Sequence, residues 1–340
     1  MTTLAQREAF LKRNGIYFYF PEKTISEDID QYTTMIIVSG LQELGYRCYS
    51  NVAHRWLMPK PIAQAQEDFV VLDVTAANYS TVLMDAFAGL KARAKLIHSR
   101  SDTNSSLLTP NGITSLMTHE SRFMPFKQKR HPWAFGLSRT WMQRHVNTTP
   151  FSTRRPVLLR NFRPSPAQSV RYALDLALLP HLEKHFEIDR TCEVSGYPAR
   201  LASSVGCLAY GGDFCGDLIK NPYFKNNSVV MALDQNRTMA RDPVVARWDS
   251  WRFWESLAAG CLTFHLDFEE YGFLLPEMPV RWKHYVPLNL ADLKGSVAEL
   301  MDRKSEWEAI AEAGKAWALD HYTPVPTAKR FIKICCEELM

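Results

Sequence analysis

The sequence has few cysteines, and their spacing excludes two common uses of this residue. The 340 residues include seven cysteines, and no two of them form a C-x-x-C pair. An odd number without paired spacing argues against a disulfide framework and against a structural zinc site. The ten histidines include no H-E-x-x-H pair and no Cys/His cluster at the spacing of metal ligands. We therefore expect a protein that works without a metal ion.

Long apolar runs are also missing. No segment approaches the ~18 consecutive apolar residues that a membrane-spanning helix requires, and even the run over 174–182 contains Asp175, Pro180 and His181. The N-terminal residues interleave charged and apolar side chains, so they lack the apolar core of a secretory signal peptide. These absences predict a cytoplasmic protein with no membrane span.

The two commonest glycine-rich phosphate-binding loops do not occur. Neither G-x-G-x-x-G nor G-x-x-x-x-G-K-[ST] is found in the sequence. Dinucleotide oxidoreductases and P-loop phosphotransferases therefore lose their usual support. We expect no bound cofactor.

Acidic residues are absent from one long stretch. Between Ser121 and Leu174 there are eleven lysines and arginines and no aspartate or glutamate, although the net charge of the chain is only +4. Such a stretch is either a surface neutralised by carboxylates elsewhere in the chain, or a surface that faces phosphate, a nucleotide or a nucleic acid. Nucleic acid is thus a candidate partner through residues 121–174.

The length and the pattern of the chain predict two α/β domains. A chain of 340 residues exceeds one ordinary core, and two domains of about 150 residues each are the natural expectation. In the first half, strands and helices alternate with connections too long for hairpins, which favours a parallel, doubly wound sheet. The expected strands cover 15–20, 46–50, 68–75 and 94–100, and the expected helices cover 29–44 and 79–90.

A second sheet is predicted to begin near Arg155. Residues 101–151 read as long loops with one helix near 138–145. A strand over 155–162 and an amphipathic helix over 165–185 then restart the alternation. Further strands are expected at 228–234, 261–267 and 283–289, followed by helices to the end of the chain. We place the domains at 1–150 and 151–322, with a last helix at 323–340.

The segment "DSWRFWESLAAGCLTFHLD" (Asp249–Asp267) combines a charged pair with a helix start and a short apolar strand. Asp249 or Ser250 is a good N-cap, and Arg252 and Glu255 share one face of the helix that follows. In a doubly wound sheet, ligands bind at the carboxyl ends of strands, where helix N-termini attract anions. A guanidinium in the first turn can hold a diphosphate, and a carboxylate one turn later can accept hydrogen bonds from a ribose. The alternative is a surface ion pair worth only ~0.3 kcal/mol.

This segment resembles the donor-site segment of exostosin-like and group 1 glycosyltransferases of the GT-B fold. The matching positions are Ser250, Arg252, Trp254, Glu255, Leu257, Ala258 and Gly260. The downstream pattern W-x-L-D-H-Y-T-P-x-x-x-A-x-R-F resembles the closing segment of such enzymes. Thr263 stands where a proline is usual, and Arg247 stands where the family has an earlier glutamate. These departures leave open whether a transfer would invert or retain the anomeric configuration.

The resemblance implies a fold, a reaction and a separate role for each domain. It implies two Rossmann-like, doubly wound parallel-sheet domains that face each other across a cleft, residues 1–150 binding the acceptor and residues 151–322 binding the donor. The helix over 323–340 would pack back on the first domain. The reaction would move a sugar from a nucleoside diphosphate sugar to a glycan or another hydroxyl acceptor, including an anionic one such as a modified DNA base. Glu255 would contact the nucleotide ribose, Arg252 with the helix N-terminus would contact the diphosphate, and Ser250 would belong to the same donor site.

Other residues are candidates for the same donor site. Arg160 and Arg163 flank the end of the first strand of the second domain and could bind the diphosphate. The alternative for both is a solvent-facing loop. Tyr210 and Gly211 form a loop that could approach a ligand closely, although paired glycines are more often a plain turn.

An inverting transfer needs a general base near the acceptor hydroxyl. The sequence offers His119, Glu120, Asp73 and Asp102, each of which could equally be structural. We rank Glu120 and His119 first, because they border the basic stretch. A retaining transfer could proceed without such a base, through stabilisation of the leaving diphosphate.

Two other functions are compatible with the same sequence. One is a non-catalytic protein that binds a nucleotide or a nucleic acid on the same two-domain frame. The other is a nucleotide-sugar epimerase, which would form product from the donor alone.

Overall fold

The chain divides into two compact units. The computed structural model describes residues 3–21, 33–64, 69–74, 81–92, 94–99, 113–123, 129–145, 149–162, 169–193, 195–215 and 244–338. Unit 1 comprises the described residues of Met1–Glu120, Phe126–Arg144 and Asp320–Met340, and unit 2 those of Ser121–Pro125 and His145–Leu319. Each unit has its own parallel sheet, which confirms the expected α/β class with two such sheets.

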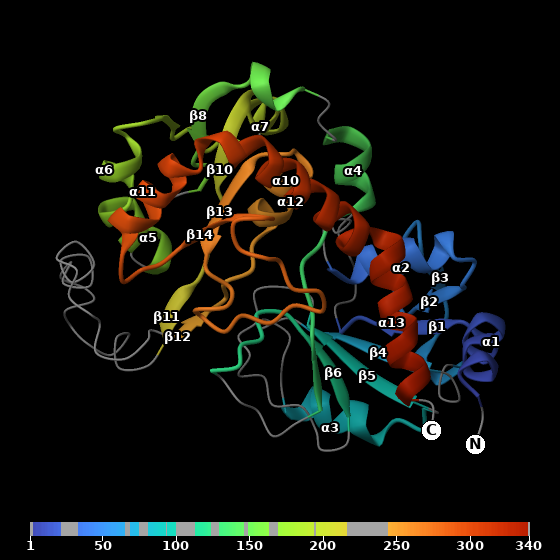
Figure 1. Cartoon of the computed structure of the whole chain (residues 1–340). Coiled ribbons are helices and arrows are strands. Elements are labelled where there is room, and N and C mark those ends of the chain that lie inside the picture. Colours follow the sequence, from blue (N-terminus) through green and yellow to red (C-terminus); the bar gives the residue numbers. More distant parts are fainter. Residues whose placement is uncertain are drawn as a thin grey trace. The chain divides into compact units, whose positions relative to one another are not determined.

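Unit 1 is built on a seven-stranded sheet with the strand order β3-β2-β1-β4-β5-β6-β7, and all of its neighbouring strands are parallel (Figure 1). Its strands are β1 (Ile16–Tyr19), β2 (Cys48–Ser50), β3 (Met58–Pro59), β4 (Phe69–Val74), β5 (Ala94–Ser99), β6 (Thr114–Met117) and β7 (Arg130–Pro132). Its helices are α1 (Leu4–Asn14), α2 (Thr33–Glu43), a 3-10 turn (Ile62–Gln64), α3 (Thr81–Gly89), α4 (Arg139–His145) and α13 (Pro324–Glu338).

The apolar strand β4 lies between β1 and β5 in the sheet. Its residues Phe69, Val70, Val71 and Leu72 are all fully buried, as expected for a parallel strand covered on both faces. The expectation of loops over 101–151 was wrong for part of this region. The short strands β6 and β7 extend the sheet there, and β6 pairs with β5.

The last helix, α13, packs against α2 within unit 1 (Figure 1, red and blue). The contact is close at Gly40 of α2. A Cβ atom added to Gly40 would lie 2.0 Å from the carbonyl oxygen of Pro324 and 2.8 Å from the Cβ of Ala328. Glycine therefore allows the backbones of the two helices to approach.

Unit 2 is built on a five-stranded parallel sheet with the strand order β14-β13-β10-β8-β9, and a separate antiparallel pair, β11 with β12. Its strands are β8 (Arg155–Leu159), β9 (Glu187–Asp189), β10 (Ser204–Leu208), β11 (Asp213–Cys215), β12 (Val244–Ala246), β13 (Leu262–Leu266) and β14 (Val286–Leu288). Its helical elements are a 3-10 turn (Phe151–Thr153), α5 (Ser169–Ala177), α6 (Leu179–Leu182), α7 (Tyr197–Ser203), α10 (Trp251–Ala258), α11 (Leu293–Asp302), a 3-10 turn (Lys304–Glu306) and most of α12 (Trp307–Tyr322). The strand expected at 228–234 lies outside the described residues.

Aromatic packing fixes the rotation of α10 about its axis. Trp254 stacks on Trp317 at 5.8 Å between ring centroids, and Phe253 lies 4.9 Å from the ring of His265. Both α10 aromatics are fully buried. Because this face of α10 is held in the core, Arg252 and Glu255 lie on the partly exposed remainder of the helix.

No helix among the residues that the structure describes is both long enough and apolar enough to cross a membrane.

Candidate functional site

The start of α10 is tied to the carboxyl end of β10. The Ser250 hydroxyl donates to the carbonyl oxygen of Ala209 at 2.9 Å, and Ala209 follows directly after β10. The Asp249 carboxylate accepts a hydrogen bond from the indole nitrogen of Trp254 at 2.8 Å. Ser250 is the N-cap residue of α10, one of the two that the sequence indicated, but its side chain makes no capping hydrogen bond. Both polar side chains instead anchor the helix, and its N-terminus lies where ligands bind in parallel sheets.

Arg252 lies next to the carboxyl end of β8. Its Nε donates to the main-chain oxygen of Asn161, two residues beyond the end of that strand. Among the described residues, no carboxylate forms an ion pair with Arg252, so the surface pair with Glu255 is not formed. One of the five guanidinium donors is used on Asn161, and the two Nη groups can meet an oxyanion.

Glu255 lies beside Tyr197, the first residue of α7. Burial raises the pKa of the Glu255 carboxyl, while the neighbouring Tyr197 phenol and the Arg252 charge partly oppose the rise. Tyr197 is itself only 8% exposed, and its hydroxyl oxygen has no hydrogen-bond partner at suitable distance and angle among the described residues. The pair thus presents a carboxyl and a phenol that could both turn to a bound hydroxyl.

Arg160 is engaged by the protein itself. Its Nε lies 3.0 Å from both carboxylate oxygens of Asp175 on α5, and its Nη1 donates to the main-chain oxygen of Phe162 at 3.2 Å. Hydrogen bonding to Asp175 raises the pKa of Arg160. With its charge matched by a buried carboxylate, Arg160 holds the loop after β8 in place. Arg163 lies outside the described residues.

Tyr210 and Gly211 lie just beyond the carboxyl end of β10. The buried Tyr210 ring packs edge-on against Phe162 at 5.4 Å, and its carbonyl oxygen accepts from Arg171 Nε at 3.3 Å. A Cβ added to Gly211 would lie 3.2 Å from the main-chain oxygen of Trp248. The structure therefore gathers Arg160, Tyr210, Gly211, Ser250 and Arg252 at the carboxyl ends of the adjacent strands β8 and β10.

Four residues of this cluster were not predicted from the sequence. They are Asn161, Arg171, Asp175 and Tyr197. Asp175 is the first acid after the basic stretch, and Tyr197 stands between a glycine and a proline at a helix start, which were usable signals. Nothing in the sequence marked Asn161, because it contributes only its main-chain oxygen.

Asp73 belongs to a buried polar group in unit 1. It lies at the end of β4 and accepts a hydrogen bond from the Thr34 hydroxyl. The same hydroxyl oxygen is 2.7 Å from His98 Nδ1, which is 4.0 Å from the Asp73 carboxylate. All three side chains are fully buried, so in this conformation Asp73 is shut off from solvent.

His119 and Glu120 follow β6 at the same carboxyl edge of the unit 1 sheet. His119 has a positive φ of 63°, uncommon for a residue other than glycine, and its ring meets Phe135 edge-on at 5.2 Å. Glu120 is 7% exposed, and its carboxylate lies 3.2 Å from Arg130 Nη1. Burial raises the pKa of Glu120, and Arg130 opposes part of the rise. Asp102 lies outside the described residues.

Solved structures with a similar fold are glycosyltransferases. A glycosyltransferase from Rickettsia africae ESF-5 aligns with a TM-score of 0.50 and 12% identity, over 95% of this chain and 98% of that chain. AviGT4, a glycosyltransferase involved in avilamycin A biosynthesis, aligns with a TM-score of 0.50 and 13% identity over the same shares. The chain has the GT-B fold. No protein-family model and no curated protein matches the sequence.

Several basic residues of the 121–174 stretch in this GT-B chain have partners within their own unit. Arg130 pairs with Glu120, Arg139 with Glu43, Lys129 with Glu338, and Arg160 with Asp175. Arg154 donates to the main-chain oxygens of Gly260, Ala259 and Thr149. These contacts favour the first alternative for residues 121–174, a surface neutralised by the rest of the chain, and give no support to a nucleic-acid partner.

In the described part of the GT-B chain, no three His, Cys, Asp or Glu side chains lie close enough together to hold a metal ion. Arg247, at the position of the family's earlier glutamate, pairs with Asp213 at 3.3 Å. A cation thus replaces a carboxylate at that position.

Proposed function

We propose that this protein is a glycosyltransferase that moves a sugar from a nucleoside diphosphate sugar to a hydroxyl acceptor, with unit 2 holding the donor. The GT-B fold supports this class of reaction. The single observation that carries the assignment of the donor site is Arg252, whose guanidinium lies at the carboxyl ends of β8 and β10 with no carboxylate partner among the described residues. Two Nη groups beside a helix start whose N-cap side chain makes no capping hydrogen bond favour a diphosphate.

Glu255 and Tyr197 are our candidates for the ribose contact. A carboxyl with a raised pKa next to a phenol can both donate to and accept from a diol. Arg160 supports the site indirectly, because its pairing with Asp175 keeps the loop that carries Asn161 in place. Tyr210 and Gly211 complete the floor of the donor site.

The chemical step joins the acceptor oxygen to the anomeric carbon and breaks the bond from that carbon to the diphosphate. The diphosphate leaves with the electron pair, and Arg252 stabilises its charge. For an inverting transfer we assign the acceptor proton to Glu120. The raised pKa of the Glu120 carboxyl brings it closer to the pKa that suits a general base. The neighbouring His119 has a positive φ, and such backbone strain is often found at functional sites.

Calorimetry with a panel of UDP-, GDP-, ADP- and CDP-sugars tests the donor site. We expect one nucleotide class to bind, and Arg252→Ala to weaken binding by about 10- to 100-fold, the range expected for charge-assisted hydrogen bonds. Arg190→Ala is the matched control, because Arg190 is an exposed arginine of unit 2 paired with Glu183. Absence of binding by the whole panel, or equal affinities for Arg252→Ala and wild type, would refute the assignment.

Transfer of a radiolabelled sugar from the best donor tests the reaction. We expect label to move to an added hydroxyl acceptor or, more slowly, to water. Binding without either reaction would instead identify a non-catalytic nucleotide-binding protein. An isomerised sugar nucleotide formed from the donor alone would identify an epimerase.

A further inference from the structure

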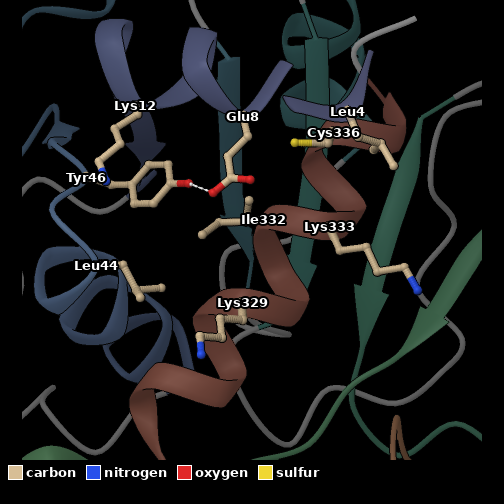
Figure 2. Close-up of a pocket in the computed structure, with 9 residues that line it drawn as sticks. All are labelled: Leu4, Glu8, Lys12, Leu44, Tyr46, Lys329, Ile332, Lys333 and Cys336. Atoms are coloured by element: carbon tan, nitrogen blue, oxygen red, sulfur yellow. Dashed lines mark hydrogen bonds between the residues drawn. The ribbon is translucent and has the colours of Figure 1, made fainter. Parts of the chain in front are cut away.

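A pocket in unit 1 has no part in the proposed transfer. It has a volume of about 450 Å³ and lies between α1, α13 and the turn before β2 (Figure 2). Its lining residues are Leu4, Glu8 and Lys12 of α1, Leu44 and Tyr46 of the turn, and Lys329, Ile332, Lys333 and Cys336 of α13.

The pocket is distinct from the candidate catalytic edge of the same sheet. Tyr46 stands two residues before β2, and α1 ends directly before β1. The pocket therefore belongs to the amino ends of these strands. Asp73 and Glu120, by contrast, lie at or after the carboxyl ends of β4 and β6.

The charge of the pocket is positive and unbalanced. Among the described residues that line the pocket, Glu8 is the one carboxylate, and it accepts a hydrogen bond from the Tyr46 hydroxyl at 2.8 Å (Figure 2). Lys12 lies over the Tyr46 ring at 5.6 Å. None of the three lining lysines forms an ion pair within the described part of the chain.

Two of these lysines stand on neighbouring turns of α13. Lys329 and Lys333 are four residues apart, and their ammonium groups point in different directions in Figure 2. Both side chains are exposed, so each can turn toward a bound anion.

The remaining walls are apolar. Ile332 and Cys336 are buried, and Leu4 stands at the edge with 61% of its surface exposed. Cationic groups beside apolar walls match a ligand with an anionic end and an apolar end.

We propose that this pocket binds a phosphomonoester with a short apolar substituent. The exposed side chains of Lys329 and Lys333 turn with Lys12 toward the phosphate, and Leu4 and Ile332 contact the apolar group. Three ammonium groups against one carboxylate leave two positive charges, which match the charge of about −1.5 to −2 on a phosphomonoester at neutral pH. The same chemistry occurs in a soluble phosphate ester and in the headgroup of phosphatidic acid, and we favour the soluble ester because the site is a pocket.

Titration calorimetry on the full chain tests the proposal with hexyl phosphate, inorganic phosphate and vesicles containing phosphatidic acid. We expect hexyl phosphate to bind at least about fivefold more tightly than inorganic phosphate, because only the ester buries apolar surface. The double variant Lys329→Ala/Lys333→Ala should weaken both ligands by about tenfold or more. Leu4→Ser should weaken hexyl phosphate alone. Lys91→Ala, an exposed lysine of unit 1 outside the pocket, is the matched control and should change neither.

Several results would overturn the proposal. They are no binding of hexyl phosphate at millimolar concentration, equal affinities for hexyl and inorganic phosphate, or an unchanged affinity in the double lysine variant. Binding to vesicles without binding of hexyl phosphate would show a membrane-surface interaction instead of an occupied pocket. The sugar-nucleotide titration of the double variant should match wild type, so this proposal and the proposed function can fail separately.

Discussion

Replacing Gly40 by alanine should destabilise unit 1, even though alanine is the better helix former. In an exposed helix, Gly→Ala gains about 1 kcal/mol. At Gly40 the new Cβ would meet the Pro324 carbonyl oxygen at 2.0 Å, the Pro324 carbonyl carbon at 2.5 Å and the Ala328 Cβ at 2.8 Å. The first two atoms belong to the backbone of α13, so no rotamer change relieves the clash. Overpacking of this kind costs about 1–3 kcal/mol or more, and here α13 must move away from α2.

Gly89 of α3 is the matched control, since no described atom lies within 4 Å of its would-be Cβ. We expect Gly40→Ala to lower the melting temperature by several degrees, since about 1 kcal/mol corresponds to roughly 2–4 °C for a domain of this size. Gly89→Ala should leave it unchanged or raise it slightly. Thermal unfolding followed by circular dichroism measures both. A Gly40→Ala protein as stable as Gly89→Ala would refute the close packing of α13 on α2.

Two further predictions concern unit 2. Asp175→Asn should lower the free energy of unfolding by about 3–5 kcal/mol in urea titrations, because it strands the charge of Arg160 in a pair whose side chains are only 6% and 10% exposed. Glu183→Gln, which breaks the Arg190 pair at 53% and 41% exposure, should cost less than about 1 kcal/mol, and equal costs would contradict the burial argument. The raised pKa of Glu255 means that the folded state holds this proton more tightly than the unfolded state, so stability should fall as the pH rises above the ordinary value of 4.5. Glu255→Gln should remove this loss, so that its melting temperature gains on wild type toward neutral pH but not at pH values below 4.5, and parallel curves would show that the carboxyl titrates normally.

Local patterns predicted the sheets where apolar runs were continuous. The strand β4 was predicted because its apolar residues are consecutive, as in a strand buried on both faces. The transition from α10 to β13 was predicted because a glycine ends the helix just before a short apolar run. The strands β6 and β7 were missed, since they have only four and three residues, β6 after a stretch rich in Ser, Thr and Asn and β7 within the basic stretch. Their pairing with β5 depends on tertiary structure.

The sequence indicated where Ser250 and Arg252 lie but not what they bond to. They were candidates because a helix N-terminus at the carboxyl ends of parallel strands attracts anions. The ion pair of Arg160 could not be predicted from neighbouring residues, because its partner Asp175 is fifteen residues away on α5. Ser250 is the N-cap residue of α10, as the sequence indicated, but its hydroxyl donates to the carbonyl oxygen of Ala209 and not to the first turn of the helix.

A crystal structure of the protein with its tightest-binding nucleoside diphosphate tests the central claim most directly. The account predicts diphosphate oxygens within hydrogen-bonding distance of the Arg252 Nη groups and the first turn of α10. A diphosphate bound elsewhere, with Arg252 still contacting only the Asn161 carbonyl oxygen, would contradict it.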